Sequence, residues 1–62
     1  MIVSFVNQYG DTVNAKFELK HKNGQEVCAS WISNFLIAEA SNFCDCYRAT
    51  FDFVIKHGIR AD

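Results

Sequence analysis

The sequence predicts an α+β fold, a small two-layer sandwich in which one helix packs on an antiparallel or mixed sheet of three or four strands. One segment near the start of the chain and one near its end alternate apolar and polar residues, which is typical of half-buried strands. A segment between them places apolar residues at helical spacing. The chain has 62 residues, which suits a single domain over residues 1–62.

A β-hairpin is the first expected element. Residues 2–9 are rich in β-branched and aromatic side chains, and residues 12–21 alternate strictly, so both segments favour strands. A glycine and an aspartate mark the turn between them. We predict a three-residue loop over residues 10–12, because it pairs Tyr9 with Val13 and keeps the apolar residues of both strands together. The apolar face then contains Val3, Phe5, Ala15, Phe17 and Leu19.

The middle of the chain allows two interpretations after the turn signal at Asn23 and Gly24. If alternation governs, residues 25–29 form a short third strand. If helical spacing governs, the helix begins early. The helical pattern joins Cys28, Trp31, Ile32, Phe35 and Leu36. Both alternatives stay open, and in either one the core of the helix covers roughly residues 30–42, where Ala, Leu and Glu favour helix.

A final strand is expected over residues 46–57, because the apolar and polar residues alternate again. One face of this strand contains Tyr47, Ala49, Phe51, Phe53 and Ile55. A short tail from Gly58 follows. The predicted order is therefore a hairpin, an optional short third strand, one helix and a final strand.

Composition narrows the class of protein. Half of the residues are hydrophobic and 21% are charged, as in a globular chain. The formal net charge of −1 argues against long-range attraction to nucleic acid or to an anionic membrane. The segment Val27–Cys44 is too short and too polar to span a membrane. Three cysteines without a secretory signal indicate a reduced compartment, so we expect a soluble cytoplasmic protein.

The chain offers no motif for catalysis. Cys44 and Cys46, with His21 or His57, supply zinc-binding atoms, but structural zinc sites space their cysteines by two to four residues. We interpret the two cysteines as small apolar side chains at a helix-to-strand junction. Three scattered glycines build no phosphate-binding loop. We therefore predict no enzyme activity, no catalytic residue, no metal and no cofactor.

The predicted helix suggests a binding surface, because Glu39 is the only charged residue from Val27 to Cys44. Depletion of charge is typical of the core of an interface. We expect a non-enzymatic interaction protein that blocks a larger protein as an inhibitor or regulator, as small phage-encoded proteins do, and that forms a homodimer. The helix face serves either the dimer or the target. The candidate partner-binding residues are Trp31, Ile37, Phe43, Tyr47 and Tyr9.

A nucleic-acid-binding module is the alternative. Lys16 and Lys20 share the polar face of the second expected strand, and Arg48 and Lys56 share that of the last one. If the two strands are close, four cations meet on one face of the sheet. Acidic residues interleaved on the same face weaken its positive field.

Overall fold

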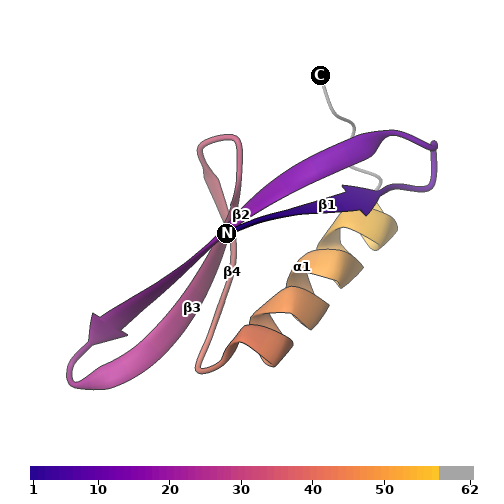
Figure 1. The fold of residues 1–62 in the computed structure, drawn as a ribbon. Helices are drawn as coiled ribbons and strands as arrows, with labels where there is room; N and C mark the ends of the chain where they lie inside the picture. The colour runs from indigo at the N-terminus through magenta and orange to yellow at the C-terminus, as the bar shows by residue number, and fades with distance from the viewer. Residues whose placement is uncertain (58–62) are drawn as a thin grey trace.

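The structure, a computed structural model, describes residues 1–57 and consists of four strands followed by one helix. The elements are β1 (Ile2–Val6), β2 (Thr12–Lys22), β3 (Gln25–Ile32), β4 (Phe35–Ala40) and α1 (Phe43–His57). The strands form one antiparallel sheet in the order β1-β2-β3-β4, and the helix packs to one side of it (Figure 1). The predicted α+β class is therefore confirmed. The tail expected from Gly58 lies outside the described residues.

Both strands of the first hairpin are confirmed, but the predicted three-residue loop is wrong. The register pairs Phe5 with Val13, not Tyr9 with Val13. A five-residue loop closes on the buried side chain of Asn7, whose Oδ1 accepts hydrogen bonds from the backbone N–H groups of Tyr9 and Asp11, each at 2.9 Å. The side-chain hydrogen bonds of Asn7 stabilise the loop, so β1 ends at Val6, three residues before the end of the predicted strand over residues 2–9.

The inward-facing residues of the hairpin are nevertheless those expected, because the register differs by an even number of positions. Val13, Ala15 and Phe17 are buried on the helix side of the sheet. Leu19 lies on the same side but remains 64% exposed. The reason is that β1 pairs with β2 only as far as Lys16, with Met1 bonded to Phe17, so the rest of β2 has no neighbour on that edge.

The turn at Asn23 and Gly24 is confirmed. Both residues have positive φ, 54° and 77°, and they join Lys22 directly to Gln25 across a two-residue loop. Two positive φ values are those of a type I′ turn, whose twist matches the strands it joins. Of the two alternatives for the following residues, the third strand is correct, and the early start of a helix is wrong.

The helix expected over residues 30–42 is also wrong, because this segment completes β3 and forms β4. Ser33 and Asn34 make the turn between the two strands, and Ser33 has a φ of 55°. Serine rarely adopts the left-handed backbone conformation, so the sequence does not predict a turn of this kind at Ser33. Ala, Leu and Glu are strong helix formers, but helix propensity differs between ordinary residues by less than about 0.7 kcal/mol each, and pairing along β3 outweighs it.

The strand expected over residues 46–57 is wrong as well, because these residues belong to α1. The helix begins after Asn42, whose Oδ1 accepts a hydrogen bond from the backbone N–H of Asp45 at 2.8 Å. The Nδ2 of Asn42 donates to the Asp45 carboxylate at 3.0 Å. Asparagine is a favoured N-cap, and the negative charge of Asp45 suits the first turn. The buried residues follow at every fourth position: Cys46, Thr50 and Val54.

The core lies between the inner face of the sheet and α1. Its buried apolar residues are Phe5, Val13, Ala15, Phe17, Cys28, Cys46 and Val54. A hydroxyl bridge crosses it: the Thr50 hydroxyl lies 2.6 Å from the Ser30 hydroxyl and donates to the backbone carbonyl of Cys46 at 2.7 Å. Because Thr50 has one hydroxyl proton, Ser30 is the donor to Thr50. Within residues 1–57, the single helix is neither long nor apolar enough to cross a membrane.

Candidate functional site: an aromatic groove beside helix α1

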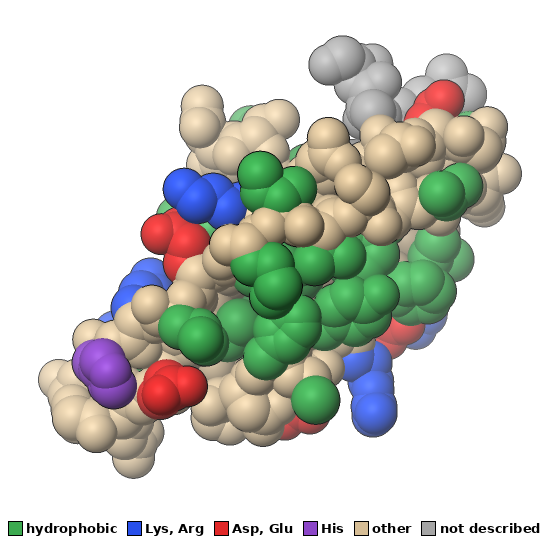
Figure 2. Space-filling view, in the orientation of Figure 1, with side chains coloured by type: hydrophobic (Ala, Val, Ile, Leu, Met, Phe, Trp, Pro, Cys, Tyr) green, Lys and Arg blue, Asp and Glu red, His purple; other side chains and the backbone are tan. Residues whose placement is uncertain are grey.

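Helix α1 does not cover the sheet evenly. It packs mainly against β4 and β3 and touches β1 much less. The inner side of β1 and β2 is instead met by aromatic side chains from one flank of the helix. In Figure 2 hydrophobic side chains form a continuous band across the face of the molecule in view. Large hydrophobic side chains outside the buried core remain exposed, among them Tyr47 and Phe51 on α1.

Five aromatic rings from β1, β2 and α1 contact one another between the helix and the sheet. We call Phe5, Phe17, Phe43, Tyr47 and Phe51 the aromatic cluster. The centroid of Phe5 lies 5.2 Å from that of Tyr47 and 6.1 Å from that of Phe51. The centroid of Phe17 lies 5.2 Å from that of Phe43 and 6.1 Å from that of Tyr47. These separations fall within the range of favourable ring contacts, so each ring holds its neighbours in place.

The helical members of the cluster border an open groove of about 550 Å³. We call it the aromatic groove, and its lining consists of Phe43, Cys44, Tyr47, Arg48 and Phe51. The strand rings Phe5 and Phe17 are buried behind it, whereas Tyr47 is 38% exposed and Phe51 is 44% exposed. The groove is therefore apolar, accessible and supported from beneath. Among residues 1–57, Arg48 is its only charged lining residue.

The structure separates the five predicted partner-binding residues. Phe43 and Tyr47 lie together in the aromatic groove, with ring centroids 5.8 Å apart. Trp31 lies on the opposite side of the sheet, paired with Lys16 and Leu36 and half-buried.

The other two predicted residues also lie away from the groove. Ile37 is half-buried in β4, at the irregularity where β3 and β4 shift register. Tyr9 is exposed in the loop between β1 and β2. The structure therefore places only two of the five predicted residues side by side, and both of them are on α1.

Sequence interpretation missed three members of the cluster, Phe5, Phe17 and Phe51, which were assigned to the core of a sheet. The signal for the helical members was present, because Phe43, Tyr47 and Phe51 are spaced by four residues and share one side of a helix. Nothing comparable links the two strand rings to the helix in the sequence. They meet it only through the fold.

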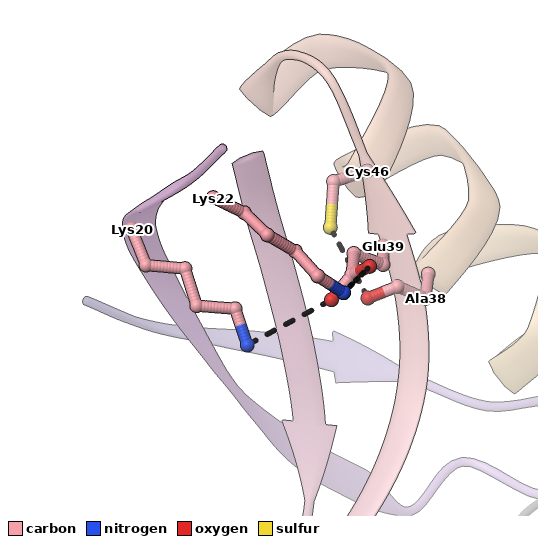
Figure 3. Close-up of polar contacts among 5 residues, drawn as sticks. All are labelled: Lys20, Lys22, Ala38, Glu39 and Cys46. Atoms are coloured by element: carbon pink, nitrogen blue, oxygen red, sulfur yellow. Dashed lines mark hydrogen bonds and ion pairs between the residues drawn. The ribbon is translucent and has the colours of Figure 1, made fainter. Parts of the chain in front are cut away.

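The charge-poor helix face that suggested an interface does not exist, because its residues form β3 and β4. Glu39, the one charged residue of that segment, forms ion pairs with two lysines of β2. The Nζ of Lys20 lies 3.7 Å from its carboxylate and that of Lys22 lies 3.9 Å from it (Figure 3). These partly exposed ion pairs contribute little to stability, but they occupy the carboxylate.

The predicted basic face is wrong too. Lys16 and Lys20 share the outer face of the sheet, whereas Arg48 and Lys56 are on α1, which packs on the inner face. Lys20 is paired with Glu39, as described above. The four cations therefore do not form one surface.

The three cysteines do not form a common site: two pack in the interior and one lies at the groove. Cys28 and Cys46 are buried, while Cys44 is exposed at the groove. Burial, a hydrogen bond with Cys46 and nearby charge raise the pKa of Cys28 to about 11, so this thiol is neutral at physiological pH. The Sγ of Cys46 faces the Ala38 carbonyl at 3.8 Å (Figure 3). Both Cys44 and Cys46 lie in the first turn of α1, not at a helix-to-strand junction.

No metal-binding constellation forms in the described part of the chain, where no three His, Cys, Asp or Glu residues group closely enough to hold an ion. Comparison of the chain with protein-family models, curated proteins and solved structures finds no match. The shape and chemistry of the aromatic groove therefore carry the functional conclusion.

Proposed function

We propose that this chain is a non-enzymatic protein-interaction module that binds a larger protein through the aromatic groove and acts as its inhibitor or regulator by covering part of its surface. One observation carries the proposal. Two large aromatic side chains of the five-ring cluster, Tyr47 and Phe51, remain 38% and 44% exposed. Aromatic residues are frequent anchors of protein interfaces, because a ring buries a large area and loses little conformational freedom.

The groove is organised before any partner arrives. Tyr47 and Phe51 both contact the ring of Phe5, which is buried and fixed in β1. A preorganised surface spends little binding free energy on ordering its side chains. The groove volume of about 550 Å³ lies within the range of about 300–1,000 Å³ that is typical of ligand-binding clefts.

Charge at the groove indicates the chemistry of the partner. Arg48 contributes the single charged side chain of the lining within residues 1–57. A guanidinium next to an apolar surface favours a partner segment that combines apolar side chains with a carboxylate. The partner surface in this proposal is thus an apolar stretch of a larger protein with an aspartate or glutamate beside it.

The proposal is tested by affinity capture with the tagged chain, followed by binding measurements with the purified captured protein. Phe51→Ala is expected to weaken binding by about 10-fold or more, in line with truncation of an aromatic anchor. Arg48→Glu is expected to weaken it as well and to reverse its salt dependence. Leu19→Ala is the matched control, since Leu19 is 64% exposed and outside the groove lining.

Equal affinity of Phe51→Ala and Leu19→Ala for the captured protein would contradict the proposal. Nuclease treatment separates it from the nucleic-acid alternative. If the captured material disappears with nuclease and binding falls steeply with added salt, the chain binds nucleic acid instead. Circular dichroism of each variant verifies that the fold is retained.

A further inference from the structure

Strand β1 is an edge strand with unusual composition. It is hydrogen-bonded to β2 on one side only, and it is the first strand of the sheet (Figure 1). Its sequence, IVSFV, carries apolar side chains on both faces. On the outer face, Ile2 is 70% exposed and Val6 is 61% exposed. Strands that are apolar on both faces are usually covered on both faces, so β1 has the composition of an interior strand at the edge of a sheet.

The hydrogen-bond pattern shows which backbone groups face the open edge. Met1 and Phe17 exchange two backbone hydrogen bonds, at 3.1 and 2.7 Å. The N–H of Asn7 donates to the carbonyl of Asp11 at 3.0 Å. In an antiparallel pair, every second residue exchanges both bonds with its partner and the residues between direct theirs outward. The outward-directed residues of β1 are therefore Ile2, Ser4 and Val6.

Strand β4, at the opposite edge of the sheet, has features that hinder pairing with a further strand. β4 carries the charged residue Glu39, and its pairing with β3 is interrupted by a bulge next to Trp31. Helix α1 also packs most closely against β4. Charge, bulges and a covering element are the usual devices that prevent another strand from joining an edge. Within residues 1–57, β1 has no charged side chain, no proline and no register shift.

We infer that β1 pairs antiparallel with β1 of a second copy of this chain, so that two four-stranded sheets become one continuous sheet across a two-fold axis. The register that satisfies the symmetry places Ser4 opposite Ser4 of the second copy and Ile2 opposite Val6. In this register all the outward-directed groups of the three residues exchange hydrogen bonds with the other strand. No other alignment about a two-fold axis pairs all three.

The side chains and charges of β1 suit this second copy. Ile2 packs beside Val6 on the outer face, and Val3 lies beside Phe5 on the inner face, so each apolar residue meets another. Residues 2–10 contain no charged side chain, and the formal net charge of one chain is only −1. Two copies therefore approach along this edge without strong electrostatic repulsion.

The pairing also extends the aromatic groove. Phe5 is the ring on which Tyr47 and Phe51 rest, and it lies on β1 itself. Joining two β1 strands brings the two aromatic clusters to the same face of the combined sheet, on either side of the axis. The homodimer expected from the sequence thus acquires an interface on β1, in place of the helix face that the structure does not contain.

The first test is the mass of the wild-type chain by sedimentation equilibrium, where twice the 7.1 kDa of one chain is expected. Ile2→Glu combined with Val6→Glu sets like charges opposite each other at both ends of the pairing and is expected to raise the dissociation constant at least about 10-fold. Glutamate is chosen because Ile2 lies opposite Lys16 within the chain, where a lysine would itself be repelled. Leu19→Glu is the matched control and is expected to leave the dimer intact.

A charge-reversal variant tests the register. Ile2→Glu combined with Val6→Lys sets opposite charges against each other in the proposed alignment, so the dimer is expected to return. A wild-type chain with the mass of one copy would overturn the inference. So would a double-glutamate variant that still dimerises, or a charge-reversal variant that remains monomeric.

Amide hydrogen exchange of the wild-type chain keeps the inference testable if the variants fail to fold. In the dimer, the amides of Ile2, Ser4 and Val6 are expected to be protected, and their protection is expected to increase with protein concentration. In a lone chain only Val3 and Phe5 of this strand are protected by β2. Fast exchange at all three outward-directed amides at high protein concentration would overturn the inference. A monomeric result leaves the proposed groove function standing, since that function is read from partner binding and not from mass.

Discussion

The bridge between Ser30 and Thr50 joins two hydroxyl groups in the buried interior between the sheet and the helix, and its removal makes a quantitative prediction. Both side chains are fully buried. Thr50→Val preserves the shape of the side chain but removes its hydroxyl, which leaves the Ser30 hydroxyl without an acceptor at 2.6 Å. An unsatisfied buried hydroxyl costs about 1–3 kcal/mol, so the free energy of unfolding is expected to fall by about that amount.

The partner substitution is expected to cost less. In Ser30→Ala, Thr50 still donates its proton to the Cys46 carbonyl at 2.7 Å, so no donor is stranded. The loss is expected to be about 0.5–1.5 kcal/mol, the net value of one hydrogen bond. The double variant removes both hydroxyl groups and is expected to be less destabilised than the sum of the two single variants by about 1 kcal/mol.

Urea unfolding followed by circular dichroism measures all four corners of this cycle. Thr12→Val is the matched control, because Thr12 is exposed on β2 and its substitution is expected to change stability by less than about 0.5 kcal/mol. Additive effects of Ser30→Ala and Thr50→Val, or a Thr50→Val variant as stable as the wild type, would refute the bridge and with it the docking of α1 on β3.

Two further predictions concern α1 and the core. Asn42→Ala removes the cap that accepts a hydrogen bond from the Asp45 N–H and is expected to lower stability by about 1 kcal/mol in urea unfolding, with Asp52→Ala as an exposed control on α1. Burial raises the pKa of Cys28 from 9.0 to about 11, so above pH 9 the unfolded chain loses a proton that the folded chain retains. Stability is therefore expected to fall between pH 9 and pH 11 with a slope of up to about 1.4 kcal/mol per pH unit, and Cys28→Ala is expected to lack this part of the slope. An identical alkaline slope in Cys28→Ala would contradict the burial of that thiol.

The class of the fold was predictable because β2 alternates without ambiguity, and its neighbour β1 is rich in strand-forming residues. The helix was misplaced for one physical reason. Residues spaced by four share a face in a strand and also in a helix, since four is both an even number and close to one helical turn. Tyr47 and Phe51 satisfy both patterns, and so do Cys28 and Ile32.

What separates the two cases is local chemistry at the ends of the elements. Asn42 and Asp45 form a helix-capping pair, but the alternating pattern that follows favoured a strand over this helix start. Ser33 has a positive φ in the turn between β3 and β4, a conformation that serine rarely adopts. The groove was predictable in part, because Phe43 and Tyr47 belong to it. The contact between the groove residue Tyr47 and Phe5 arises only from the packing of α1 on β1, and the spacing of residues along the chain does not predict it.

The most direct test of the aromatic groove as the binding surface is site-specific photo-crosslinking in a lysate of the source cell. Phe51→p-benzoylphenylalanine places the photoreactive ring in the groove, and Leu19→p-benzoylphenylalanine places it on an exposed apolar position outside the groove lining. The account predicts one dominant adduct to a larger protein from position 51 that is absent from position 19 and that Arg48→Glu weakens. The same adducts from both positions, or an adduct from position 19 alone, would contradict it.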